Sequence, residues 1–295
     1  MPIPRKSMYV LVIFLFLISL AILSLKNTLQ IKITEIDIYV ETQQEGRSLS
    51  GISLALVSDL HLRNSSSGIE NWQQLIDSIN NSAADYVLLA GDYISNINDL
   101  SLVRELQNKF IDSLTAIEKP YALVLGNYET WTDRQSWLDA FAAQGIPALE
   151  NQAIVLEGDK PICVIGIGDA YTGYDKSISI PPDCSQYPVI QLTHDPAAAF
   201  RADGSGIWLA GHTHCGQVRL PLLGPLWVPS EAPKESHCGL YEDEVKKVFV
   251  SSGVGSSILP LRFLAQSQIE IITFYWSSSI FHIHFFCCSG RWFWI

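Results

Sequence analysis

The sequence has few positive charges and no closely paired cysteines of the CxxC type. It contains 19 lysine and arginine residues against 30 aspartate and glutamate residues, which gives a formal net charge of −11. Nucleic-acid binding requires a basic surface, so this shortage of cations argues against a nucleic-acid partner. The six scattered cysteines predict neither a zinc-finger spacing nor a disulfide framework. Cys163 lies in an apolar run and is interpreted as a small buried hydrophobic residue.

A recognisable cleavage site is also missing near the N-terminus. Residues 8–25, MYVLVIFLFLISLAILSL, form an uncharged apolar run that follows a short basic segment, residues 1–7. The run is just long enough for a membrane-spanning helix, and its end has no small-x-small motif. We therefore predict an uncleaved single-pass anchor in the inner membrane. Basic residues on its two sides nearly balance, so the side of the membrane that holds the remaining chain stays open.

The C-terminal residues 277–295, SSSIFHIHFFCCSGRWFWI, lack any strand-and-turn pattern. They contain candidate metal ligands, namely His282, His284, Cys287 and Cys288. The segment is short for a membrane span, and its composition does not continue that of the preceding domain. We interpret it as an atypical aromatic tail, arising from a shifted reading frame or a poorly packed extension, and not as a metal site.

The middle of the chain alternates strand-like and helix-like segments. Residues 31–40 alternate polar and apolar side chains, as in a half-buried strand. Five unalternating apolar runs follow, each ending in polar residues: Ile52–Val57, Tyr86–Ala90, Tyr121–Leu125, Val189–Leu192 and Ile207–Ala210. Helix-like stretches occupy Glu70–Asn80, Leu100–Ile117 and Arg134–Gln144. This alternation predicts an α/β fold with a largely parallel sheet, whose strand ends meet at one rim.

Seven potential metal ligands would gather at that rim: Asp59, His61, Asp92, Asn127, His194, His212 and His214. By itself, the H-x-H pair in LAGHTHCGQVRLP fits a loop with two solvated rings. Five matching strand ends favour metal binding instead. Carboxylate, carboxamide and imidazole ligands suit manganese, iron or zinc. Seven ligands exceed the needs of one ion, but they suit two ions about 3.5–4 Å apart that share a carboxylate.

The motifs SDLH, GDY, GNYE, THDP and GHTHCGQ, in this order, resemble the motif series of the calcineurin-like metallophosphoesterases. The segments GHTHCGQVRLPLLGPL and VSSGVGSSILPLRF are similar to a membrane-anchored bacterial branch associated with UDP-2,3-diacylglucosamine hydrolase activity in lipid A synthesis. The resemblance covers residues 31–275 and implies a metallophosphoesterase domain over that range. The implied fold is a four-layer αββα sandwich of two mixed sheets, preceded here by the N-terminal transmembrane helix.

The resemblance also implies roles for individual residues. The first metal ion would be held by Asp59, His61 and His214, and the second by Asn127, His194 and His212. Asp92 would bridge the two divalent ions, for which manganese is favoured. Cys215 occupies a position where this branch usually has glycine.

The family motif commonly continues Gly-Asn with a histidine that contacts phosphate and protonates the leaving group, and this chain has Tyr128 there. An alkoxide, whose conjugate acid has a pKa close to that of water at about 15.7, needs such an acid. A phosphate monoester, with a pKa of about 6, hardly needs one. The substitution therefore favours a pyrophosphate or aryl phosphate substrate. Tyr128 is interpreted either as a phosphate hydrogen-bond donor or as a packing residue.

We therefore predict a phosphohydrolase in which Asp92, Asn127, Tyr128 and His212 take part in catalysis. Its substrate is expected to be phosphorylated and lipid-linked, such as UDP-2,3-diacylglucosamine, and no obligate protein partner is indicated. Two alternatives stay open: a phosphodiesterase acting on soluble nucleotides or cell-wall esters, and a metal-binding but catalytically weak membrane protein. Five apolar residues near the rim would form either a lipid-facing lip or part of the core, and the core is favoured: Leu220, Leu222, Leu223, Phe263 and Leu264.

Overall fold

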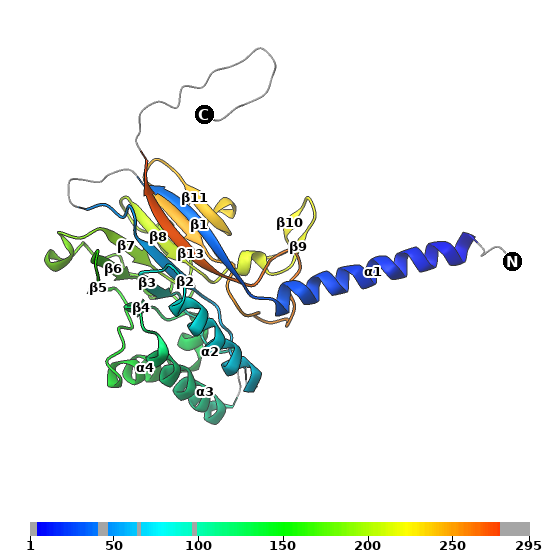
Figure 1. The fold of residues 1–295 in the computed structure, drawn as a ribbon, viewed down its shortest axis with the longest axis horizontal. Coiled ribbons are helices and arrows are strands. Elements are labelled where there is room, and N and C mark those ends of the chain that lie inside the picture. The colour runs from blue at the N-terminus through cyan, green and yellow to red at the C-terminus, as the bar shows by residue number, and fades with distance from the viewer. Residues whose placement is uncertain (1–4, 41–46, 64–65, 96–98, 278–295) are drawn as a thin grey trace, which may run out of the picture.

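The computed structural model describes residues 5–40, 47–63, 66–95 and 99–277, and two β-sheets form its centre (Figure 1). The first sheet consists of β1 (Lys32–Val40), β13 (Gln268–Trp276), β2 (Ser53–Val57), β3 (Tyr86–Leu89) and β4 (Tyr121–Leu123), in that order. The second consists of β11 (Gly239–Glu242), β12 (Lys246–Val250), β8 (Gly206–Ala210), β7 (Val189–Leu192), β6 (Ile162–Gly166) and β5 (Gln152–Leu156). Both sheets are mixed, because parallel central strands have antiparallel neighbours.

The two sheets pack face to face. Leu56 and Leu88 of the first sheet share one buried apolar cluster with Ile190 and Leu209 of the second. The outer face of the first sheet is covered by α2 (Ser66–Asn80), α3 (Leu100–Ser113) and α4 (Asn127–Ala143). The outer face of the second is covered by the short α5 (Ala197–Arg201) and by irregular segments. This confirms the α/β sandwich with mixed sheets.

The five strands with polar ends do not share one sheet, which corrects the expectation of a single parallel sheet. β2, β3 and β4 lie in the first sheet, whereas β7 and β8 lie in the second. Each set is internally parallel. Both faces of these strands are covered, one by the opposite sheet and one by the outer layer, so their apolar runs do not reveal which sheet they join.

Four cysteines form disulfides, contrary to the expectation of no disulfide framework. Cys163 pairs with Cys184, and Cys215 pairs with Cys238. The paired residues are 21 and 23 positions apart in the sequence, so no short cysteine motif predicts these pairs. Cys163 is buried as predicted, but as a bonded half-cystine. The tail residues that were interpreted as not forming a metal site, His282, His284, Cys287 and Cys288, lie outside the described residues.

Residues 8–25 belong to α1 (Arg5–Leu29), a helix that projects from the domain (Figure 1). In the described part of the chain, no helix has the length and apolar character that crossing a membrane requires. The predicted membrane span is therefore not confirmed, although the helix is present. The remaining elements are the hairpin β9 (Arg219–Leu220) and β10 (Gly224–Pro225) and the 3₁₀ turns Leu114–Ala116, Pro182–Cys184, His214–Gly216 and Lys234–Ser236.

Candidate metal centre

The structure brings together all seven side chains that were predicted as metal ligands. Each lies just beyond the carboxyl end of β2, β3, β4, β7 or β8. Two buried groups result, each with ligand atoms within 4.8 Å of one another. The first group consists of Asp59, His61 and His214, and the second consists of Asp92, His194 and His212.

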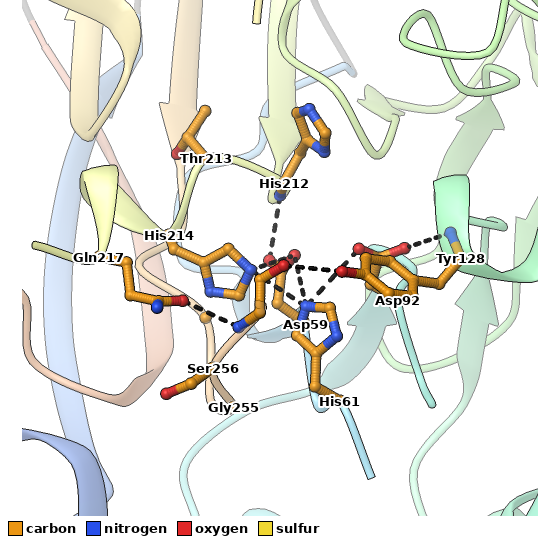
Figure 2. A network of polar contacts seen from close by, with 12 residues as sticks. Asp59, His61, Asp92, Tyr128, His212, Thr213, His214, Gln217, Gly255 and Ser256 are labelled. Carbon is orange, nitrogen blue, oxygen red and sulfur yellow. Dashed lines mark hydrogen bonds and ion pairs between the residues drawn. The ribbon is translucent and has the colours of Figure 1, made fainter. Parts of the chain in front are cut away.

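Asp92 lies between the two groups. Its Oδ2 atom is 3.6 Å from His61 Nε2 and 3.4 Å from His194 Nε2. Asn127 joins the second group, with its Oδ1 atom 3.1 Å from His194 Nε2. Figure 2 shows the Asp59, His61 and Asp92 side chains converging beneath the His212–His214 loop. One carboxylate can therefore serve two adjacent ions.

The hydrogen bonds of the second group leave ring nitrogens free to face a cation. His194 Nδ1 donates to the carbonyl oxygen of Ala90 at 2.6 Å, and His212 Nε2 donates to that of Pro229 at 2.7 Å. A carbonyl only accepts, so these bonds fix which nitrogen carries the proton. The other two nitrogens, His194 Nε2 and His212 Nδ1, lie 3.2 Å apart.

The first group has buried polar atoms without a protein partner. Asp59 Oδ1 and His61 Nδ1 make no hydrogen bond, and Asp59 Oδ1 lies 3.4 Å from His214 Nε2. The Nε2 atoms of His61 and His214 are 3.1 Å apart. Leaving such a carboxylate oxygen unpaired in the interior is unfavourable. A divalent cation held by Asp59 Oδ1 and the Nε2 atoms of His61 and His214 would satisfy that oxygen, so the residues present fit a dinuclear metal site.

Burial and neighbouring charges set the protonation of the imidazoles. Burial lowers the pKa of His61 despite the opposing effect of Asp92. Burial, reinforced by Arg262, holds the pKa of His214 well below its usual value. Both rings are therefore neutral near pH 7, as metal ligation requires. Burial also opposes charge on His194, but Asp92 outweighs it and raises the pKa of His194 well above its usual value. A bound cation would take the place of that proton.

The backbone that carries these side chains is strained. Positive φ angles occur at Asp59, His61, Asp92, His212 and His214, between 44° and 68°. Non-glycine residues rarely adopt this left-handed region, and they do so mainly where the surrounding structure imposes it. Close packing also explains Gly211, because a Cβ atom there would lie 2.6 Å from Ser58 Cβ and 2.7 Å from Asp59 Oδ2.

Glu129 holds two of the ligand loops together, a role that sequence reasoning missed. Its buried carboxylate accepts hydrogen bonds from the backbone N–H groups of Asp92, Tyr93 and Gly126, at 2.8–2.9 Å. It is the third residue after the Gly126 N-cap of α4, where acidic residues commonly bond back to the cap. The three-residue spacing between Gly126 and Glu129 was the sequence signal that could have indicated this role.

Arg262 was also missed. This fully buried arginine donates to the carbonyl oxygens of Gly255 and Ser252, and its Nη2 atom lies 2.9 Å from His214 Nδ1. Burial lowers the pKa of Arg262 to about 10, with Asp59 and Glu270 opposing the shift. The guanidinium is therefore charged near pH 7, and it lies against the His214 ring. An arginine within an apolar loop gives no sequence signal for such a contact.

Tyr128 borders the first group. Its ring packs edge-on against His61 with centroids 4.8 Å apart, and its hydroxyl bonds Ser257 Oγ at 2.8 Å. Burial raises the pKa of Tyr128 above its ordinary value, so its hydroxyl keeps its proton. On the opposite side Tyr171 packs against His212 with centroids 4.8 Å apart, and both Tyr171 and Trp131 are partly exposed.

Other residues near the motifs have structural roles. The Asp195 carboxylate accepts a hydrogen bond from the Ala197 N–H at 3.0 Å, at the start of α5. Asp169 accepts from the Thr172 N–H and hydroxyl in a turn. Arg63 and Arg219 bond the carbonyl oxygens of Ser256 and Cys215.

The leucines assigned to the core are exposed. Leu222 and Leu223 are 106% and 79% exposed, and Leu220 and Leu264 are also on the surface, whereas Phe263 is half-buried. The core assignment was wrong for the four leucines because they lie in a two-stranded hairpin and a loop that no layer covers.

Comparison with known proteins agrees with this geometry. Residues 52–216 match the family model of the calcineurin-like phosphoesterases. Among the relatives is a Danio rerio "Transmembrane protein with metallophosphoesterase domain", 29% identical over 272 residues, which cover 86% of this chain but 60% of that protein. Another is "Phosphodiesterase YaeI" of Escherichia coli strain K12, 30% identical over 196 residues, covering 64% of this chain and 69% of that one.

A solved structure of a dimetal phosphatase from Danio rerio has a TM-score of 0.47 and 12% identity, covering 69% of this chain and 88% of that chain. The chain spans less than two thirds of the first Danio rerio relative's length. The family match covers more than half of this chain and includes the five strand ends. The chain thus belongs to the calcineurin-like phosphoesterase family, and its two Asp/His groups fit a dinuclear metal site.

Proposed function

We propose that this chain hydrolyses a phosphodiester or pyrophosphate bond in a membrane-associated substrate. The observation that carries the proposal is the pair of buried Asp/His groups joined by Asp92. Asp59, His61 and His214 would hold one ion. Asn127, His194 and His212 would hold the other, with Asp92 contacting both. Manganese is kept as the preferred candidate from the sequence resemblance, whereas the carboxylate, carboxamide and imidazole ligands by themselves suit manganese, iron or zinc.

Two bound divalent ions of this kind polarise phosphoryl oxygens and lower the pKa of water. The residues of the chain would set the geometry. Asp92 fixes the spacing of the two groups, and its Oδ1 atom accepts the Tyr128 N–H at 2.9 Å, which ties the β3 and β4 loops together. Asn127 and His212 line the second group, next to the reacting phosphate.

Tyr128 would donate a hydrogen bond to the phosphate without transferring its proton, because burial raises its pKa. A good leaving group needs no proton from the enzyme, whereas an alkoxide does. The proposal therefore specifies pyrophosphate or aryl phosphate bonds over simple alkyl phosphodiesters.

Two substrate classes remain candidates. The sequence resemblance favours UDP-2,3-diacylglucosamine, which would need the site on the cytoplasmic face, where that lipid A precursor is made. The two disulfides favour a phosphodiester on the oxidising side of the membrane, because structural disulfides persist mainly in exported domains. The name of the Escherichia coli relative, a phosphodiesterase, also supports the second class. We favour a phosphodiester with a good leaving group, such as an aryl phosphodiester, on the oxidising side.

Membrane association is proposed through α1. This helix exposes Tyr9, Phe14, Leu15, Ile18 and Ile22, and one relative is named a transmembrane protein. Apolar side chains exposed along an isolated helix are more stable in lipid than in water.

The test uses the full chain in mild detergent, loaded with manganese and assayed on three substrates. These are UDP-2,3-diacylglucosamine, an aryl phosphodiester and an alkyl phosphodiester. Turnover of either of the first two at least tenfold above the third supports the proposal, and the ratio between them selects the substrate class. Absence of turnover with two ions bound per chain, measured by elemental analysis, would refute it.

A further inference from the structure

The inference concerns an apolar surface beside the metal centre, here called the docking surface. It comprises Leu222, Leu223, Leu226 and Trp227 of the β9–β10 hairpin and Ile258, Leu259, Leu261 and Leu264 of the loop 256–264. All eight side chains are exposed, including Trp227 at 63% and Ile258 at 76%. Single exposed apolar residues are ordinary, but a contiguous group marks an interaction site.

The hairpin and the loop form one surface. Val218 bridges Phe263 in parallel, and the Arg219 N–H donates to the Phe263 carbonyl at 2.9 Å. The Gln217 side chain donates to the Leu259 carbonyl at 2.9 Å.

The docking surface adjoins the end of α1. The Arg262 N–H donates to Thr28 Oγ1 at 2.7 Å, and the Ser267 N–H donates to the Asn27 carbonyl at 3.2 Å. Figure 1 shows α1 and the β9–β10 hairpin on the same side of the domain. The C-terminal end of α1 and the docking surface are therefore neighbours on this side of the domain.

The charge around this face is opposite in sign to that of the chain. None of the 30 acidic residues lies in residues 5–34, 216–230 or 254–269, which contain α1, the β9–β10 hairpin and the loop 256–264. Lys26 and Arg63 are exposed there, and Arg63 donates to the Ser256 carbonyl at 3.2 Å. Leucines and a tryptophan bordered by cations match the boundary between lipid tails and anionic headgroups.

We propose that the docking surface binds the surface of an anionic lipid bilayer, with Leu222, Leu223 and Trp227 inserted at the headgroup boundary. The metal centre lies directly behind it, because Ser257 bonds the Tyr128 hydroxyl and Arg262 contacts His214. Docking presents the metal centre to phosphate groups held at the membrane. It is a binding property, separate from the proposed catalysis.

The experiment measures hydrogen–deuterium exchange of the full chain with vesicles of equal parts phosphatidylglycerol and phosphatidylcholine, with phosphatidylcholine vesicles, and without lipid. A site-resolved readout is needed because α1 alone could attach the chain. We expect amides in residues 219–228 and 256–264 to exchange on the order of tenfold more slowly with the anionic vesicles, and less so with the neutral ones.

The triple variant Leu222→Ser, Leu223→Ser, Trp227→Ser should lose this protection while hydrolysing a soluble aryl phosphodiester as the parent does. A matched control, Leu240→Ser with Val245→Ser, changes exposed apolar residues at the β11–β12 hairpin and should keep it.

Protection of α1 without protection of the two segments would overturn the proposal. The proposal would also be overturned if, without lipid, amide exchange in these two segments slowed as the protein concentration rose. A second copy of the chain would then be covering the surface. Docking without hydrolysis of any phosphoester would leave this inference standing and refute the proposed function.

Discussion

Asp92 is the residue on which both halves of the metal centre depend. Its two carboxylate oxygens make different contacts. Oδ2 faces His61 and His194, and Oδ1 accepts a hydrogen bond from the Tyr128 N–H. The sequence placed it at the end of a buried strand, but only the structure shows it between the two groups.

Replacing Asp92 by Asn keeps the shape of the side chain and removes its negative charge. We expect Asp92→Asn to lose metal and to lower turnover by at least about 100-fold, because one shared carboxylate balances part of the charge of two cations. Elemental analysis and steady-state kinetics measure both effects. Asp77→Asn, an exposed change on α2, is the control. Full metal content and activity in Asp92→Asn would contradict the assigned bridging role.

Replacing Tyr128 by His should restore a proton donor for poor leaving groups. We expect Tyr128→His to raise the ratio of alkyl to aryl phosphodiester turnover by about 100-fold, the lower range for general acid catalysis. Tyr128→Phe, which lacks a titratable donor, should leave that ratio unchanged. An unchanged ratio in Tyr128→His would show that the leaving-group argument is wrong.

At the scale of elements, buried carboxylates tie strands and loops together. Glu129 joins the β3 and β4 loops at the start of α4. Glu270 in β13 accepts from Ser251 Oγ at 2.7 Å and from Gln268 Nε2 at 2.8 Å, which connects the first sheet to the segment after β12.

The ionisation of Glu270 makes the free energy of unfolding depend on pH. Burial raises its pKa from 4.5 to about 7, so the folded state holds a proton that the unfolded state releases between these values. This contribution to stability is present below about pH 4.5 and is lost as pH rises to about 7.

We expect Glu270→Gln, which stays neutral, to gain stability relative to the parent between pH 5 and pH 8, by up to about 3 kcal/mol. Urea denaturation at the two pH values measures the difference. Glu70→Gln at the exposed start of α2 should show no such trend. Equal effects of Glu270→Gln at both pH values would refute the assignment.

At the scale of the whole molecule, the two disulfides bear on the compartment in which the domain folds, because disulfides persist mainly in oxidising compartments. All four cysteines in the described residues are paired, and Cys215 has a φ of 53°, a conformation that glycine adopts most easily. This accounts for the glycine that the resembling branch usually has at this position.

We expect Cys163, Cys184, Cys215 and Cys238 to resist alkylation when cells are quenched with acid and their thiols are trapped, as read by peptide mass spectrometry. Reduction should lower the free energy of unfolding by about 3 kcal/mol per bond, given loops of this length. Cysteine-to-serine changes at one pair should reproduce the loss for that bond. Quantitative labelling of all four would place the domain in a reducing compartment and favour the cytoplasmic substrate.

The sequence by itself determined the strand ends and the ligand types. Apolar runs that stop at aspartate, asparagine or histidine indicate buried strands and their carboxyl ends. This pattern can be recognised from the sequence because it lies within a few consecutive residues. It also predicted the strand over 31–40, found as β1 at Lys32–Val40. Boundaries were less certain. α4 spans Asn127–Ala143, but Asp133 within it has non-helical φ and ψ angles of −171° and 82°, so the predicted start at Arg134 matches the part that follows this kink. The preceding part, from Asn127, was not predicted, and it depends on Glu129 bonding the backbone of Gly126.

Only the tertiary structure decided which distant segments meet. It split the five strands between two sheets, paired the four cysteines, placed Arg262 against His214 and left the hairpin leucines exposed. Each of these depends on packing between residues far apart in the chain. Local periodicity carries no information about such contacts, because a strand buried on both faces gives the same apolar run in either sheet.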